Sequence, residues 1–275
     1  MYYDLKSKKL IKEDTSNSLK FLYNTIIGRC ILKVACSHFI ANLYATYMNS
    51  IFSKIKIKKF IRKNGIDMSE YEDKNYKSFN DFFMRKIKPD KRKINSGLIA
   101  VCDSKLSVYK INDNSTFNIK NSKYTINELI RSDDNNYEYA LVFRLCVDDY
   151  HHYAFPDDGK VISTKSINGI LHTVQPIAFK KNKVFTENAR TITYLDCDNL
   201  GKVCYIEVGA MMIGKIVNEE VTTFKKGDEK GHFEFGGSTV ILLIEKNKVE
   251  INETILKNTE NDIETIVKMG DQIGW

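Results

Sequence analysis

The stretch Gly236-Gly237-Ser238-Thr239-Val240-Ile241-Leu242-Leu243-Ile244 places two glycines and a serine directly before an apolar, β-branched run. The run has the composition of a buried strand, and the glycines can adopt the backbone conformations of a tight corner at its start. We therefore expect Ser238 at the mouth of a strand. Two interpretations fit this corner: a hairpin turn in which Ser238 is only solvated, or a site of backbone chemistry.

Similar strand-like runs fill the chain after Gly97. Leu106–Ile111, Ala140–Val147 and Val203–Ala210 are rich in β-branched residues and are separated by Asn, Asp and Gly. Besides a few turns, only Asn127–Ile130 looks helical in this part of the chain. The sequence therefore predicts an α+β, mainly β fold, in which an antiparallel β barrel or sandwich follows an N-terminal helical arm.

The N-terminal quarter is basic and has a helical pattern. Residues 1–63 carry a net charge of +10, whereas the remaining 212 residues carry −3. Apolar residues recur at helical spacing from Ser18 to about Met48, and Ser50–Asn64 mixes Ile and Phe with Lys before Gly65. A basic amphipathic helix pair is typical of proteins that lie on anionic lipid, although a solvated face packed on the domain behind it has the same pattern. No nucleic-acid reader motif accompanies the charge, so we expect no nucleic-acid partner.

Length and composition fit one core with a helical appendage. The chain has 275 residues, of which 43% are hydrophobic and 28% charged. We divide it into a membrane-associating region, 1–77, and a β-rich domain, 78–275. No apolar stretch is long enough for a span and no cleavable signal is visible, so we expect a peripheral protein on the cytoplasmic side of the cell membrane.

The six cysteines lie singly inside apolar segments, which predicts buried thiols, no disulfide and no metal.

Ordered motifs punctuate the chain from Phe79 to Ile244. In chain order they are Phe79–Pro89 (Phe-Asn-x-Phe-Phe-x-Arg-x-x-x-Pro), Ile119–Ile126, Asp149–Pro156 (Asp-Tyr-His-x-x-x-x-Pro), Gly169–Pro176, Val208–Ile216 and Gly227–Thr239 (Gly-Asp-Glu-x-Gly-x-Phe-x-Phe-Gly-Gly-Ser-Thr). This series resembles the phosphatidylserine decarboxylase proenzymes, and the pattern is similar to bacterial, clostridial-type members of that family.

Polar residues that could carry chemistry lie inside these motifs. Asp103 ends an apolar run, which by itself is typical of a turn aspartate, and the adjacent His151 and His152 directly after a strand indicate a general base. The resemblance implies that Asp103 is the acid of a charge relay and that His151 matches the family's first histidine. Ala154 stands where many members carry the relay's second histidine. His151, His152 or the auxiliary candidate His172 must then take that role.

The resemblance also implies self-cleavage between Gly237 and Ser238. A base would remove the Ser238 proton, the peptide would shift to an ester, and elimination and hydrolysis would leave a pyruvoyl group on an α chain of residues 238–275, paired with a β chain of residues 1–237. This cofactor would form a Schiff base with the amine of phosphatidylserine and stabilise the carbanion left by CO2. His151 is the favoured donor of the proton that completes phosphatidylethanolamine.

Two other functions fit parts of the sequence. A pyruvoyl decarboxylase acting on a soluble amino acid would keep the motifs, but the basic N-terminal quarter argues against it. A non-catalytic β-barrel binding module would keep the Gly-Gly-Ser turn for structure and lose its histidine, as Ala154 suggests. Cleavage into two chains separates the enzymes from the module.

Overall fold

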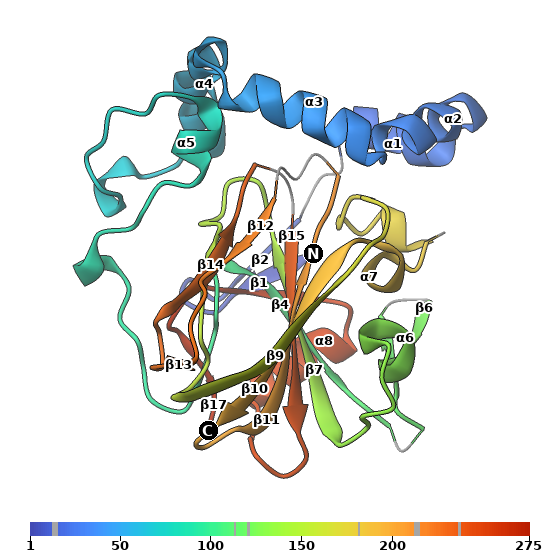
Figure 1. The fold of residues 1–275 in the computed structure, drawn as a ribbon, viewed down its shortest axis with the longest axis vertical. Helices are drawn as coiled ribbons and strands as arrows, with labels where there is room; N and C mark the ends of the chain where they lie inside the picture. Colours follow the sequence, from blue (N-terminus) through green and yellow to red (C-terminus); the bar gives the residue numbers. More distant parts are fainter. Residues whose placement is uncertain (13–15, 113, 120–121, 181, 212–214, 236–237) are drawn as a thin grey trace.

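The body of the molecule is a ten-stranded sheet (Figure 1), and the computed structural model describes residues 1–12, 16–112, 114–119, 122–180, 182–211, 215–235 and 238–275. Strand order is β13-β9-β10-β11-β15-β7-β4-β16-β1-β2, and the described pairs are antiparallel except β1 with β16, which is parallel. The strands are β1 (Tyr2–Asp4), β2 (Lys9–Ile11), β4 (Ser104–Lys110), β7 (Tyr137–Leu145), β9 (Gly159–Ile167), β10 (Arg190–Cys197), β11 (Gly201–Val208), β13 (Thr223–Phe224), β15 (Ser238–Glu245) and β16 (Glu264–Val267).

This architecture confirms the α+β, mainly β prediction, but no closed barrel forms among the described residues. The sheet has two edges, β13 and β2, and no described pairing joins them. The hairpin of β1 and β2 extends one edge, so the chain's first strands lie in the sheet and not in the helical region. Strands this short carry too little periodicity to be visible in the sequence.

A smaller sheet covers part of one face of the large one. It consists of β12 (Ile216–Asn218), β14 (Glu229–Phe233) and β8 (His152–Ala154). The two sheets are joined by the Tyr205 hydroxyl of β11, which donates to the carbonyl oxygen of Ala154 at 3.2 Å, and by the Lys230 ammonium of β14, which donates to Glu207 of β11. Two candidate residues begin strands of these layers, His152 in β8 of the smaller sheet and Ser238 in β15 of the large one.

The N-terminal helices lie across one end of the sheet (Figure 1). They are α1 (Asn17–Asn24), α2 (Ile26–Ala35), α3 (His38–Asn49), the 3-10 turn η1 (Ile51–Lys54) and α4 (Ile55–Asn64). The stripe expected from Ser18 to Met48 is broken into three helices, because Thr25 and Ser37 have extended backbones and cap the helices that follow them. Gly65, at φ +62°, ends α4 as predicted.

Membrane-spanning potential is limited in this region. Within the described residues no single helix is long and apolar enough to cross a membrane. The Ile26–Ala35 and Phe39–Asn49 segments together reach that length and composition, but they bend by 68° between them.

A short helix, α5 (Phe79–Phe83), ties this helical layer to the sheets. The sequence offers Ser78 or Asn80 as its cap and Pro89 as its end. Ser78 is the cap and accepts from the Asp81 amide, but the helix ends at Phe83 and Pro89 opens a separate turn. The α5 phenylalanines are buried in a second small core with Met48 and Ile57 of the helical layer. The remaining elements are η2 (Met68–Glu70), η3 (Pro89–Lys91), β3 (Leu98–Ile99), β5 (Thr116–Ile119), β6 (Ser122–Thr125), α6 (Ile126–Ile130), η4 (Ala178–Lys180), α7 (Val184–Glu187), α8 (Glu253–Glu260) and β17 (Gln272–Gly274).

The cysteines partly follow the prediction of buried thiols. Cys36, Cys102, Cys197 and Cys204 are buried and Cys146 is half-buried, but Cys30 on α2 is exposed. Its neighbours on α2 are also exposed apolar residues, which explains why an apolar sequence context did not mean burial here.

Candidate functional site

Ser238 is the first residue of β15, as predicted, and lies opposite Leu145 of β7. Its side chain is fully buried, and its hydroxyl has no hydrogen-bond partner among the described residues. Side chains alternate along a strand, so Ser238 shares a face with Val240. Val240 lies opposite Glu207, whose side chain contacts the smaller sheet, and Ser238 therefore faces that sheet. Gly236 and Gly237, and with them the expected cleavage site, lie outside the described residues.

His151 is a fully buried imidazole in a defined tautomer. Its Nδ1 lies 2.8 Å from the carbonyl oxygen of Asp149, which can only accept, so Nδ1 carries the hydrogen and Nε2 has a free lone pair. That Nε2 is buried without a partner. Burial lowers the pKa of His151 to about 3, so the ring is neutral near pH 7. The ring also lies 4.0 Å from that of Phe83, and the His151 carbonyl accepts from the Phe233 amide.

His152 has a different environment from its neighbour, with partners at both ring nitrogens. Nδ1 lies 2.7 Å from a Glu229 carboxylate oxygen, and Nε2 lies 3.2 Å from the carbonyl oxygen of Met84. Both partners are oxygen acceptors, so both ring nitrogens of His152 are engaged with neighbouring groups. Burial would raise the pKa of Glu229, but the hydrogen bond to His152 and the nearby His232 hold it below its usual range. His152 therefore has no ring nitrogen left without a partner.

Asp103 is fully buried among cations. Its carboxylate accepts from Arg92 at 2.9 Å, from Lys268 at 2.9 Å and from the Met269 amide at 2.8 Å. Burial alone would raise the pKa of Asp103, but Lys268 and Arg92 lower it below the usual value, so the side chain is ionised. Among the described contacts of Asp103 there is no imidazole, and the structure does not bring it to His151, His152 or His172.

His172 lies between the helical layer and the sheet domain. Its Nδ1 is 3.4 Å from the Tyr23 hydroxyl and 3.5 Å from the Cys36 thiol, and its Nε2 is 3.9 Å from Glu187. Burial lowers the pKa of His172, and Glu187 partly offsets this. No described contact joins His172 to Ser238.

Sequence reasoning gave no site role to two polar residues of the first motif, Asn80 and Arg85. The Asn80 side-chain oxygen accepts from the Phe235 amide at 2.8 Å, just before the glycine pair, and its nitrogen donates to Asn49 at 2.9 Å. The buried Arg85 donates to the Asp148 carbonyl at 3.1 Å. Their polar side chains in a motif rich in phenylalanine were the signal, because packing alone does not need them.

A cavity of about 170 Å³ lies between α3 and the ends of β9, β10 and β11, and none of the candidate residues is in its lining. Its lining includes Ala41 and Asn42 of α3, Lys215, and Gly209. Gly209 follows Val208, which lies opposite Thr239, so the cavity borders the strand end that carries Ser238. Gly209 belongs to the Val208–Ile216 motif, and a Cβ there would lie 3.2 Å from the Ala189 carbonyl oxygen, so the two backbone segments approach closely. Met212 to Gly214 of the same motif lie outside the described residues. A larger cavity, about 850 Å³, lies at Asp158, Asp196 and Phe224 and is lined by none of the candidate residues.

Comparison with known proteins matches residues 79–275 to the family model described as phosphatidylserine decarboxylase. The phosphatidylserine decarboxylase proenzyme 2 of Clostridium acetobutylicum is 49% identical, over 98% of this chain and 96% of its own length. The phosphatidylserine decarboxylase proenzymes of Clostridium botulinum (39% identical, covering 99% of this chain and 98% of that protein) and Fusobacterium nucleatum (38%, covering 98% and 94%) match over similar lengths.

Proposed function

This chain belongs to the phosphatidylserine decarboxylase family, whose members are made as proenzymes and depend on a pyruvoyl group, and we propose that Ser238 is the residue from which it forms that group. The reaction is decarboxylation of phosphatidylserine to phosphatidylethanolamine and CO2. Cleavage would occur between Gly237 and Ser238 and leave a β chain of residues 1–237 and an α chain of residues 238–275.

The observation that carries this proposal is that the Ser238 hydroxyl and His151 Nε2 are two of the buried polar atoms that have no hydrogen-bond partner among the described residues. Buried polar groups in folded proteins are nearly always hydrogen-bonded, so two orphans in one region are typical of groups reserved for chemistry. Tyr153 points from β8 toward Tyr205 of the large sheet, and His151, two positions earlier on an extended chain, shares that side. His151 would then face the surface on which Ser238 lies.

The chemistry assigns a task to each atom. His151 Nε2 accepts the Ser238 proton while the Ser238 oxygen bonds to the Gly237 carbonyl carbon. The Gly237–Ser238 C–N bond then breaks and the freed nitrogen takes a proton. The amide has thereby become an ester. The Asp149 carbonyl fixes the tautomer that makes His151 a base. Once formed, the pyruvoyl group supplies an electron sink for loss of CO2. His151 would then deliver the proton that replaces CO2 on the substrate carbon.

Asp103 enters this proposal as a positioning residue. Its ionised carboxylate pairs with Lys268 and Arg92. Lys268 also interacts electrostatically with Asp149, which forms a second buried pair with Lys105 at 3.2 Å. Asp149 in turn orients His151 through its carbonyl. A charge change at Asp103 would therefore reach the imidazole through this network.

We further propose that α2 to α4 dock on an anionic membrane at its cytoplasmic face. Their outer surface exposes large apolar side chains, including Ile55 (83% exposed), Phe52 (79%) and Phe39 (74%). Exposed lysines such as Lys58 and Lys59 flank them, as in helices that lie in a lipid interface. The same layer reaches the site, because the α3 residue Tyr44 packs 5.7 Å from Phe235. A lipid substrate held at this surface would be next to the cavity that α3 lines.

The test is the mass of the C-terminal fragment together with Ser238→Ala. We expect wild type to give two bands and a fragment beginning with a pyruvoyl group at position 238, and Ser238→Ala to remain one inactive chain. Ser107→Ala, which removes another buried serine hydroxyl, should cleave and turn over normally. Normal fragments from Ser238→Ala would end the assignment.

A further inference from the structure

A cluster of metal-ligating side chains lies on the far side of β8 and β14 from Ser238. We propose that His152, Glu229 and His232 form a binding site for a divalent transition-metal ion, with zinc as the best fit. The proposal rests on this geometry and does not depend on the assignment of the pyruvoyl serine.

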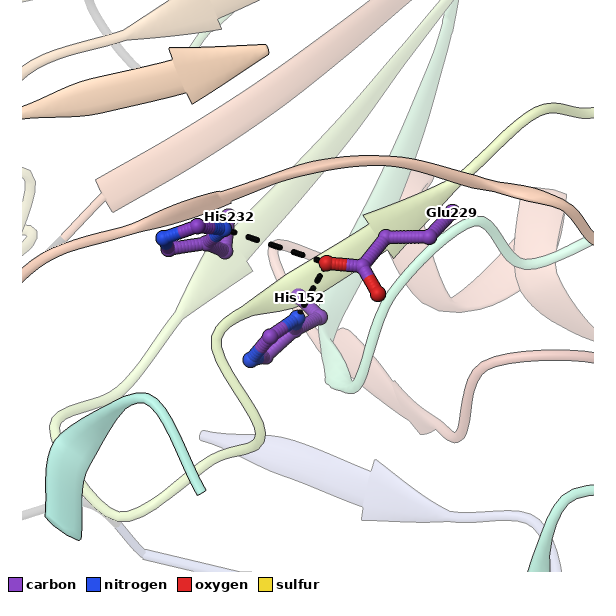
Figure 2. Close-up of side chains that lie close together, drawn as sticks. All are labelled: His152, Glu229 and His232. Atoms are coloured by element: carbon purple, nitrogen blue, oxygen red, sulfur yellow. Dashed lines mark hydrogen bonds and ion pairs between the residues drawn. The ribbon is translucent and has the colours of Figure 1, made fainter. Parts of the chain in front are cut away.

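The three side chains converge on one point (Figure 2). Nδ1 of His152 lies 2.7 Å and Nδ1 of His232 3.8 Å from the same oxygen of Glu229. One ligand atom from each residue falls within 4.8 Å of the other two. His232 Nδ1 is a buried atom without a hydrogen-bond partner in the described part of the chain, so one possible metal ligand of the set is unused there.

A β-bulge creates this convergence. Glu229 and His232 are three positions apart, and in a regular strand they would point to opposite faces. The register of β14 on β8 shifts between Glu229 and Gly231, so that Lys230 turns inward to Glu207 while Glu229 and His232 share the outer face. His232 is directly paired with His152, which brings the third donor alongside.

The donors and the distances suit zinc. Two imidazoles and a carboxylate are common zinc ligands, and bonds of about 2.0 to 2.2 Å place neighbouring ligand atoms about 3.3 Å apart in a tetrahedron. The present separations of 2.7 and 3.8 Å lie on either side of that value, so each needs to change by about half an ångström. The His232 side chain is partly exposed and can make that movement, and a water can complete the fourth position on the open side of Glu229.

Binding exchanges a proton for the metal. Nδ1 of His152 carries a hydrogen toward Glu229, and the ion takes its place, releasing one proton to solvent while Nε2 keeps its bond to Met84. Lys86 lies 3.4 Å from the other Glu229 oxygen, but it is largely exposed and free to turn into solvent. The Tyr150 ring stacks 4.7 Å from His152 and covers the site's other wall. A bound ion would join β8 to β14 more firmly.

The experiment is a ZnCl2 titration by calorimetry and by Tm, with MgCl2 as the comparison ion, on the full chain carrying Cys30→Ser so that the exposed thiol does not compete. We expect one zinc per chain, a zinc-dependent rise in Tm, no response to magnesium, and proton release that varies with buffer. His232→Gln and Glu229→Gln should each weaken zinc binding at least roughly tenfold.

His172→Gln is the matched control, because His172 also lies beside a glutamate, Glu187, but outside the cluster, and it should bind zinc like the parent. Circular dichroism confirms that each variant is folded. Equal zinc affinity in the parent, His232→Gln and Glu229→Gln would overturn the site. Absence of zinc binding by the folded parent would also overturn it and leave a hydrogen-bonded histidine–carboxylate pair in its place.

Discussion

Lys230 of β14 donates to Glu207 of β11, and this ion pair spans the two layers whose strands β15 and β8 begin at Ser238 and His152. The Lys230 and Glu207 side chains are 2% and 0% exposed. Lys230 also donates to Asn218 at 3.1 Å and lies 4.8 Å from the Tyr205 ring centre. Because Glu207 shares a sheet face with Ser238, the pair sets the spacing of the layers at the site.

Removing one partner of this pair should be costly. Lys230→Met leaves the Glu207 carboxylate buried and unpaired, which typically destabilises a protein by about 3–5 kcal/mol. Replacing both partners in Lys230→Met/Glu207→Leu should recover much of that loss. We would measure urea unfolding in the uncleaved Ser238→Ala background, with Lys257→Met as control, since its pair with Glu253 is exposed and is worth at most about 1 kcal/mol. A Lys230→Met protein as stable as the control would show that the pair is dispensable.

The three histidines should separate by function. His151→Ala should abolish turnover and slow cleavage strongly, because it removes the base nitrogen that has no other partner. His152→Ala should chiefly reduce stability, since both of its nitrogens are already bonded. His172→Ala tests the auxiliary role expected from the missing histidine at Ala154. Cleavage is scored on a gel and lipid turnover separately; full cleavage and turnover without His151 would move the chemistry to His152 or His172.

The pH dependence of stability gives an independent check of the buried neutral His151. Its pKa is lowered from about 6.5 in the unfolded chain to about 3 in the folded one, so below pH 6.5 the unfolded state binds a proton that the folded state cannot. The unfolding free energy should therefore fall by up to about 1.4 kcal/mol per pH unit between pH 6 and pH 4 from this residue. In the Ser238→Ala background, His151→Gln should show a shallower fall over that interval. Identical slopes in the two proteins would mean that His151 is protonated in the fold.

The sequence predicted the local elements of this protein better than its long-range contacts. The strand after Ser238 and the caps at Ser78 and Gly65 follow from residue type alone, because each depends on a few neighbouring positions. The contact of Asp103 with Lys268 could not be predicted in this way, because Lys268 is 165 residues away and only the fold brings it near.

The outer cluster was hidden for a similar reason. The cysteine spacing predicted no metal site. The periodicity of the sequence does not indicate the β-bulge that turns Glu229 and His232 to one face of the sheet. The order of the motifs indicated the family, but it did not predict that the Asn80 side chain accepts a hydrogen bond from the Phe235 amide.

Asn80→Ala should slow self-cleavage without abolishing it. The substitution removes the hydrogen-bond acceptor of the Phe235 amide, so the backbone directly before Gly236 is no longer held in position by Asn80. Misplacement of a reacting bond by about 1 Å can cost about 100-fold in rate, and we expect a reduction of 10- to 100-fold. Asn49→Ala is the matched control, because it removes one acceptor of the Asn80 amide nitrogen but leaves the Phe235 amide bonded. Cleavage is followed over time on a gel, and equal rates in the two variants would remove Asn80 from the site.

Membrane docking should depend on two separable properties of the helical layer. Lys58→Gln/Lys59→Gln should weaken binding to anionic vesicles by about 2 kcal/mol at low salt, since each basic side chain near such a surface contributes about 1 kcal/mol, and the difference should shrink as salt screens it. Phe52→Ser/Ile55→Ser should weaken binding at every salt concentration, because it removes buried apolar area. Lys56 is left unchanged, because its ammonium lies 4.4 Å from the Tyr47 ring centre and is half-buried.

The control for docking changes the same charge elsewhere. Lys110→Gln/Lys257→Gln lowers the net charge equally on exposed residues of the sheet domain, so it should bind vesicles like wild type if the helical layer is the docking surface. Sedimentation with vesicles of phosphatidylglycerol and phosphatidylcholine, which contain no substrate, measures binding apart from turnover. If both lysine pairs weaken binding equally, attraction is a property of total charge. If Phe52→Ser/Ile55→Ser binds like wild type as well, the exposed apolar face of α4 and η1 does not enter the bilayer.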